Sequence, residues 1–200
     1  ESADEGNIEV GQTQMEVAKF QFQETSSRED MQIRQLVLYV EGSAANANDL
    51  RNFTVYGDDG VALGSAAMLD SENNATVNLS PAYTLGDANG RTRNLTVKVD
   101  AVDGANNWFR VQLQNDYDIL VRGVTTGANV AATDADGIFG VTSTNGYFKI
   151  KRGALTITKN AASPSGSLTE GAQNVELARF DLTANGEALE LRKLGIAIVS

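Results

Sequence analysis

Aspartates gathered in glycine-containing loops are the residues of this chain best suited to bind a metal ion. Asp134 and Asp136 stand in the run Thr-Asp-Ala-Asp-Gly, and carboxylates at this spacing supply the oxygen ligands that calcium prefers. The run is not an EF-hand, because its glycine comes too early and no glutamate follows where that loop needs one. We predict a calcium site at Asp134 and Asp136. Asp-Gly is also favourable turn chemistry, and this alternative stays open for the pair and for the other loop aspartates, which are Asp58, Asp59, Asp100, Asp103, Asp116 and Asp118.

Sequons of the form Asn-x-Ser/Thr are candidate sites for N-linked glycans. Their asparagines are Asn52, Asn74, Asn78 and Asn94, all within one stretch of the chain, which suits a glycosylated face. A chain rich in asparagine, serine and threonine also produces such triplets by chance, and Asn94 falls on a predicted strand. Both interpretations stay open.

Three aromatic residues, Trp108, Tyr117 and Tyr147, could form a platform on which sugar rings stack. Trp108 is followed by Phe109, so in a strand the two rings point to opposite faces. The alternative is that the tryptophan lies in the core, as is common in β-sandwiches. The aromatic residues therefore make a glycan a candidate ligand, and the packing of the tryptophan in the core stays open as the alternative.

Other kinds of chemistry are excluded by what the chain lacks. It contains no histidine and no cysteine, which removes the commonest general base, the commonest transition-metal ligands and disulfides. No glycine-rich phosphate-binding motif follows a strand. A net charge of −10 opposes binding to nucleic acid. We therefore predict no enzyme and no cofactor other than calcium, and the lack of a long apolar run predicts no membrane span.

Alternation of apolar and polar residues predicts strands along most of the chain. Asp-Gly and Asn-Gly pairs between the strands predict tight turns. Many short strands separated by such turns are typical of a β-sandwich. The expected core residues are Phe20, Phe22, Leu36, Leu38, Val55, Leu95, Val97, Phe109, Val111 and Phe148.

An internal repeat is the strongest feature of the sequence. Residues 6–25 align with residues 166–185, and after a short deletion residues 29–40 align with residues 187–198. The identical residues of the first part are Gly6, Gly11, Glu16, Ala18 and Phe20, which recur as Gly166, Gly171, Glu176, Ala178 and Phe180. We conclude that the chain holds one full unit and the opening strands of a second.

A shared irregularity supports this repeat. In the first copy the apolar positions switch from odd to even numbers between Ile33 and Leu36, and the second copy switches between Leu191 and Leu194. A strand that changes its buried face needs a bulge. We place the bulges at Arg34–Gln35 and Arg192–Lys193.

The segment 153–200 carries a family resemblance. It reads Gly-Ala-Leu-Thr-Ile-Thr-Lys-Asn, then Ser-Pro-Ser-Gly, then Val-Glu-Leu-Ala-Arg-Phe-Asp-Leu-Thr-Ala and Leu-Arg-Lys-Leu. This resembles the tandem immunoglobulin-like repeats of secreted surface and S-layer-like proteins of uncultivated bacteria and archaea. The resemblance implies an all-β, immunoglobulin-like Greek-key sandwich over residues 1–152 and a partial second repeat over residues 153–200, with a linker at 161–166. It also implies an extracellular or cell-surface location.

These features together predict a structural protein. We expect a subunit or fragment of a self-assembling surface layer or filament, with copies joined head to tail by strand pairing. The alternative is a carbohydrate-binding or adhesion module of a larger secreted protein. No strand before Gly6 matches the one at 155–159, so we expect that the first unit lacks its leading strand or that this strand has been removed. The second unit is expected to expose an apolar assembly face made of Ala178, Phe180, Leu182, Leu191, Leu194 and Ile196.

Overall fold

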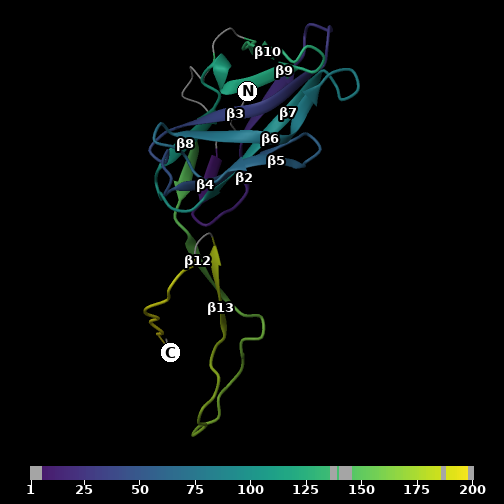
Figure 1. Ribbon diagram of the computed structural model, residues 1–200. Coiled ribbons are helices and arrows are strands. Elements are labelled where there is room, and N and C mark those ends of the chain that lie inside the picture. The colour runs from purple at the N-terminus through teal and green to yellow at the C-terminus, as the bar shows by residue number, and fades with distance from the viewer. Residues whose placement is uncertain (1–5, 136–138, 140–145, 186–187, 198–200) are drawn as a thin grey trace.

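The computed structural model describes residues 6–135, 139, 146–185 and 188–197 (Figure 1). Within these residues the chain forms β-strands and one 3₁₀ turn, and no α-helix. The all-β prediction is confirmed. The elements are β1 (Gly6–Glu9), β2 (Met15–Gln23), β3 (Met31–Glu41), β4 (Leu50–Tyr56), β5 (Ala62–Ala66), β6 (Asn74–Leu85), β7 (Thr92–Ala101), β8 (Trp108–Gln112), η1 (Asp116–Asp118), β9 (Ile119–Gly123), β10 (Asn129–Val130), β11 (Phe148–Lys151), β12 (Ala154–Lys159) and β13 (Phe180–Asn185).

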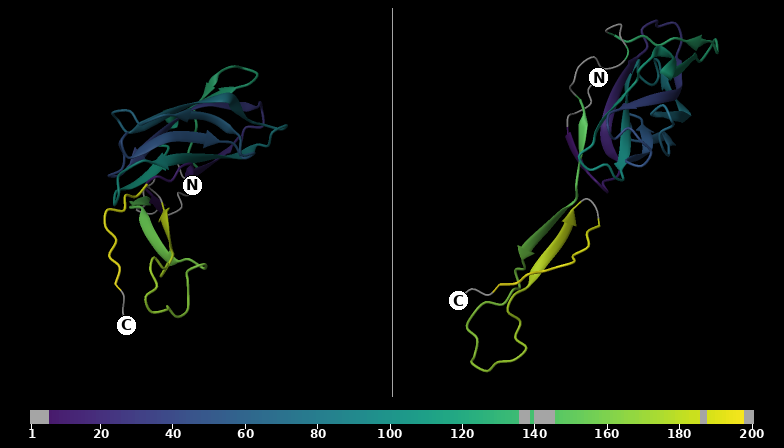
Figure 2. Two further views of the ribbon diagram at one scale, coloured as in Figure 1. Left: turned by 90° about the horizontal axis from the view of Figure 1, so that it is seen from below. Right: turned by 90° about the vertical axis from the view of Figure 1, so that its left-hand side faces the viewer.

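Two sheets form the body of the molecule. The larger has the order β1-β11-β8-β3-β9-β10, with β6 also paired to β3, and the smaller has the order β2-β7-β4-β5. Strands β1 and β11 are parallel, and the other pairs of both sheets are antiparallel. The chain passes repeatedly from one sheet to the other, since β2, β4, β5 and β7 belong to one and β3, β6 and β8 to the other. The result is a sandwich, whose two layers are seen in Figure 2.

The core lies between these sheets and consists mainly of aliphatic side chains. Phe20 and Phe22 were expected in the core, but they are only partly buried and pack against its margin. The reason is that β2 lies at the end of its sheet, with no further strand beside it among the described residues. The other expected core residues are buried, namely Leu36, Leu38, Val55, Leu95, Val97, Phe109, Val111 and Phe148.

The bulge predicted in β3 is confirmed. The register shifts between Ile33 and Gln35 in the pairing of β3 with both β6 and β9. Ile33 and Leu36 are both buried, although they have opposite parity in the sequence. The extra residue therefore allows one long strand to bury apolar side chains on both sides of the irregularity.

Strands β12 and β13 pair with each other and, in the part of the chain that the structure describes, form a separate two-stranded sheet. Figures 1 and 2 show this hairpin projecting away from the sandwich. The segment 161–166 lies in the loop between β12 and β13, while Arg152 and Gly153 join β11 to β12. Residues 188–197, the second-copy counterpart of β3, are not in a strand, so Arg192–Lys193 interrupts no ladder there.

Candidate assembly surface

The predicted assembly residues all lie on the projecting segment, and all are exposed. Phe180 and Leu182 are on β13, and Phe180 is 48% exposed. Ile196, in the irregular segment that follows, is 75% exposed. The remaining members, Ala178, Leu191 and Leu194, are exposed too. Apolar side chains are therefore presented to solvent along most of the second copy.

The first copy buries the same positions. Ala18, Ile33, Leu36 and Leu38 are at most 4% exposed, and they are the counterparts of Ala178, Leu191, Leu194 and Ile196. Phe20 and Phe22, the counterparts of Phe180 and Leu182, are half-buried. The same sequence pattern is thus covered by a complete sandwich in one copy and uncovered in the other.

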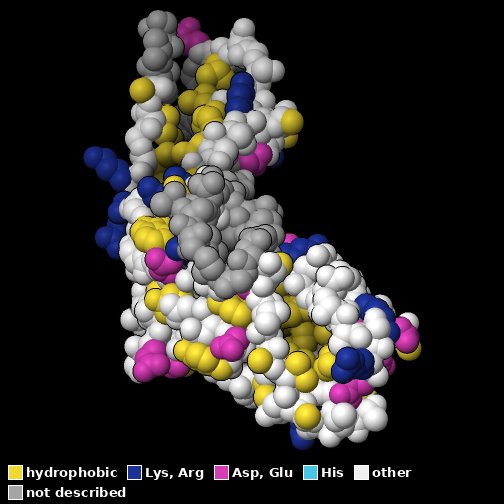
Figure 3. Space-filling view, turned by 90° about the horizontal axis from the view of Figure 1, so that it is seen from above, with side chains coloured by type: hydrophobic (Ala, Val, Ile, Leu, Met, Phe, Trp, Pro, Cys, Tyr) yellow, Lys and Arg dark blue, Asp and Glu magenta, His cyan; other side chains and the backbone are white. Residues whose placement is uncertain are grey.

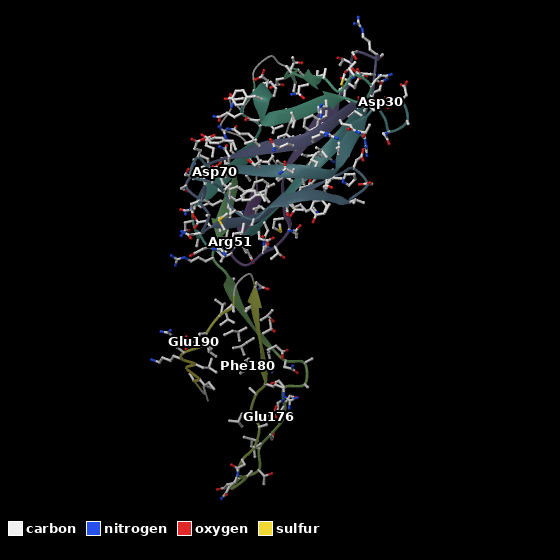
Figure 4. All side chains as sticks on the ribbon, viewed as in Figure 1. Asp30, Arg51, Asp70, Glu176, Phe180 and Glu190 are labelled. Carbon is white, nitrogen blue, oxygen red and sulfur yellow. The ribbon has the colours of Figure 1, made fainter. Side chains whose placement is uncertain are left out.

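The exposed apolar side chains gather on one side of the segment. The upper part of Figure 3 shows them in yellow between the two arms of the projecting region. Phe180, labelled in Figure 4, lies on β13 well away from the sandwich, and Glu176 and Glu190 lie on either arm. No residue of the segment joins the core cluster within the described residues. The structure therefore places the predicted residues on β13 and on the irregular stretches beside it, without packing them into a core.

The register of the β12–β13 hairpin places further apolar side chains on this side. Ile157 lies opposite Leu182, and Leu155 lies opposite Ala184. Directly opposite residues of paired strands point to the same face, so Leu155 and Ile157 extend the apolar side. Both are exposed. The sequence signalled them through their alternation with threonine, although they were not among the predicted assembly residues.

Strand β2 supplies a second surface suited to strand pairing. It is at the end of the four-stranded sheet and pairs with β7, Phe20 opposite Leu95 and Phe22 opposite Arg93. Within the described part of the chain its other edge has no strand partner. The expected lack of a leading strand in the first unit stays a prediction. An edge of this kind exposes backbone donors and acceptors that another strand can satisfy.

Trp108 and Tyr147 form an exposed aromatic pair. Their ring centroids are 6.0 Å apart with an interplanar angle of 71°, and both rings are more than a third exposed. Phe109 is fully buried, so the expected division between the two faces of β8 is confirmed. Tyr117 lies on η1, and no ring contact joins it to this pair in the residues described. The edge-on geometry gives two differently oriented rings rather than one flat platform.

The loop aspartates are engaged in turns and ion pairs. Asp59 accepts a hydrogen bond from the N–H of Val61, and Asp118 accepts from the N–H of Asn115 at 2.7 Å. Asp134 is half-buried after β10, whereas its predicted partner Asp136 lies outside the described residues. Within those residues no group of three or more acidic side chains could hold a metal ion. The calcium site remains a prediction.

The sequon asparagines are divided between the two sheets. Asn52 is exposed on β4 and donates to Asp100 at 2.7 Å, and Asn94 is half-exposed on β7. Asn74 and Asn78 are on β6 of the larger sheet, and Asn78 accepts from the amide of Gln35. The sequons therefore do not share one sheet, and their modification remains a prediction.

The buried Glu24 and the half-buried Glu29 fix loops of the sandwich. Glu24 accepts a hydrogen bond from the hydroxyl of Ser26 at 2.5 Å and from the N–H of Ser27, and Arg91 is its ion-pair partner. The hydrogen bond from Ser26 is the main cause that lowers the pKa of Glu24, against the opposing effect of burial. Hydrogen bonds from Thr126 similarly lower the pKa of Glu29. Both side chains stay ionised and hold their loops, which is a structural role that the sequence pattern did not indicate.

Two surface hollows among the described residues are open and polar. The larger, about 570 Å³, is lined by Val10, Asp49, Asp103, Gly104, Ala105 and Arg152. In it Asp49 accepts a hydrogen bond from the side chain of Asn107 at 2.8 Å, so this carboxylate stabilises the loop that leads into β8. No nucleophile and base lie together there. The surfaces that remain are the exposed apolar segment and the open edge of β2.

Comparison of the chain with protein-family models, with curated proteins and with solved structures finds no match. Among the described residues, no helix has the length and apolar character needed to cross a membrane.

Proposed function

We propose that this chain is a structural protein of the cell exterior, a subunit of a self-assembling surface layer or filament whose copies join through residues 154–200. The observation that carries the proposal is the exposure of Phe180, Leu182, Leu191, Leu194 and Ile196 on the projecting segment. Large exposed apolar patches mark interaction surfaces. The counterparts of these residues in the first copy lie in or against a sandwich core, which indicates the kind of environment that they require.

The exposed apolar side chains of the segment offer a driving force for association. Covering about 1,000 Å² of apolar surface contributes about 25 kcal/mol before the entropic costs of association are subtracted. A two-stranded hairpin is at best marginally stable alone. Pairing with another copy would therefore order the segment and remove its apolar side chains from water in one step.

The proposed location is supported by composition and by the resemblance to secreted surface repeats. A chain with no cysteine cannot be inactivated by thiol oxidation, and a net charge of −10 favours solubility before assembly. A layer or filament needs strands, edges and complementary faces, and it needs no catalytic group.

The test is removal of residues 154–200. The full chain is expected to form regular lattices or filaments in negative-stain electron microscopy, and the shortened chain is expected to stay monomeric by light scattering. Circular dichroism of the shortened chain checks that the sandwich remains folded. Assembly that persists unchanged after the removal contradicts the proposal.

A second candidate function, carbohydrate binding, is favoured by the exposed Trp108–Tyr147 pair. Exposed rings at this spacing can stack on the apolar face of a sugar. A glycan array probed with the full chain and with Trp108→Ala tests it. Binding that the substitution abolishes supports this function, and the absence of binding by the unaltered chain rejects it.

A further inference from the structure

The internal repeat indicates which kind of strand would pair with the open edge of β2. Residues 20–25 of the first copy correspond to residues 180–185 of the second, which form β13. In the second copy this strand is paired along its whole length with β12. In the first copy the corresponding strand, β2, lacks such a neighbour within the described residues. The β12–β13 hairpin is therefore a template for what binds at β2.

We infer that β2 is an acceptor site for the β12 strand of a second copy of this chain, which leaves its own β13 and adds to the four-stranded sheet. This inference rests on the proposed function, because it assumes that copies join by strand pairing. It adds the identity of the donor strand, the identity of the acceptor edge and the register between them.

The register follows from the repeat. Lys159 pairs with Phe180, Thr158 with Asp181 and Ile157 with Leu182 in the hairpin. Transferred to the first copy, Lys159 lies opposite Phe20, Thr158 opposite Gln21, Ile157 opposite Phe22 and Thr156 opposite Gln23.

Side-chain character supports this register. Ile157 comes beside Phe22 on the side where Phe20 and Phe22 are half-exposed, so it covers the margin of the core. Thr158 comes beside Gln21 on the exposed side, where both are polar. Aromatic and β-branched side chains are favourable cross-strand neighbours. The donor strand thus presents Ile157 to the margin of the core and Thr158 to solvent, while Lys159 lies beside Phe20 on the same side as Ile157.

The β12 strand should be more stable beside β2 than beside β13. In the hairpin every residue of β12 and β13 is exposed, and neither strand pairs with a third strand among the residues that the structure describes. At β2 the same strand would become the fifth of a sheet that already packs on a core. Sheets of three or more strands with an apolar face are stable where isolated hairpins are marginal.

The chain cannot place its own β12 on its own β2. Lys151 pairs with Glu9, and the N–H of Val10 donates to the carbonyl of Lys151 at 2.9 Å, so β11 ends near the beginning of β2. The register requires Thr156 beside Gln23, at the far end of the nine-residue strand, about 26 Å away at ~3.3 Å per step. The residues from Arg152 to Thr156 extend at most about 18 Å. A β12 strand that pairs with β2 in this register must therefore come from another copy.

Engineered disulfides test the register, because the native chain has no cysteine. Gln21→Cys and Thr158→Cys variants are mixed in equal amounts under mild oxidation, and a Gln23→Cys and Thr156→Cys mixture is treated in the same way. Directly opposite residues of antiparallel strands have Cα atoms about 4.5–5.5 Å apart, within disulfide range. Gln21→Cys mixed with Thr156→Cys is the control, since a shift of two residues takes the pair out of range.

Cross-linked dimers are expected in both matched mixtures and not in the control, as read on non-reducing gels and confirmed by mass spectrometry. The inference is overturned if the matched mixtures give no dimer or if the control gives the same yield. Light scattering of the unaltered chain separates this failure from failure of the proposed function. Assembly without register-specific cross-links rejects the β2 site alone, whereas a chain that neither cross-links nor assembles rejects both.

Discussion

The hydroxyl of Tyr83, on β6, donates a hydrogen bond of 2.8 Å to the backbone carbonyl of Asn94, on β7. The two strands belong to different sheets, so this bond ties the layers of the sandwich together. Arg93 lies over the ring of Tyr83, 4.0 Å from its centroid, and pairs with Asp58 on a neighbouring loop. One side chain thus joins two sheets and a loop.

Replacing Tyr83 by phenylalanine removes this bond and keeps the buried ring. The substitution is expected to lower the free energy of unfolding by about 1–2 kcal/mol, because the carbonyl of Asn94 loses a partner. Urea denaturation followed by circular dichroism measures the change. Tyr117→Phe is the control, since Tyr117 is 78% exposed and its substitution should have little effect. Equal effects of the two substitutions would contradict the role given to Tyr83.

Burial raises the pKa of Tyr83 from 10.0 to about 12. The unfolded chain therefore loses this proton at lower pH than the folded chain does. The contribution to stability is complete below pH 10 and is lost as the pH rises through about 12. The difference in unfolding free energy between the unaltered chain and Tyr83→Phe should shrink over this interval. A difference that stays constant from pH 8 to about 12 would show that the hydroxyl does not titrate in this way.

In the acid range, Glu24 is the group expected to make stability depend on pH. The hydrogen bond from Ser26, followed by those from the backbone, holds the pKa of Glu24 below its ordinary value of 4.5. The contribution to stability is present above pH 4.5 and is lost as the pH falls through the lower pKa of the folded chain. On acidification the Glu24→Gln variant should therefore lose less stability than the unaltered chain does. The urea midpoints of both proteins between pH 7 and about 3 measure this difference. Glu16→Gln, at an exposed position of β2, controls for the removal of one charge.

Trp108 and Phe109 are adjacent in β8 but differ in environment. Phe109 is fully buried, with its ring centroid 5.8 Å from that of Phe148, whereas Trp108 is 39% exposed. Phe109→Ala is expected to lower the free energy of unfolding by about 3–5 kcal/mol through lost burial and the cavity left behind. Trp108→Ala should cost clearly less. Thermal and urea unfolding of the two variants provide the comparison. A larger loss of stability for Trp108→Ala than for Phe109→Ala would mean that β8 turns its other face to the core.

The exposed apolar segment should govern assembly and leave the stability of the sandwich unchanged. Phe180→Asp combined with Ile196→Asp places charges at two exposed positions. Light scattering should show reduced assembly, while the urea midpoint of the sandwich stays the same. Val61→Asp, at an exposed apolar position outside the segment, is the matched control. A fall in the urea midpoint of the double variant would instead mean that the segment packs on the sandwich.

Local patterns in the sequence determined much of the fold. Alternation identified the strands that carry Leu95, Phe109 and Phe148, because side chains of a strand point to opposite faces in turn. The parity switch between Ile33 and Leu36 located the bulge of β3, since only an inserted residue keeps both side chains buried. The repeat also predicted that the second copy exposes apolar residues, which the structure shows.

Only the tertiary structure decided which strands become neighbours. Strand partners are far apart in the chain, so nothing local to β2 states that β7 covers one edge and that the other stays open. For the same reason Phe20 and Phe22 were expected in the core and are half-buried at its margin. The bond between Tyr83 and Asn94 depends on two sheets meeting face to face, which alternation within one strand does not encode. Periodicity fixes which side of a strand is apolar, whereas topology fixes whether another layer covers it.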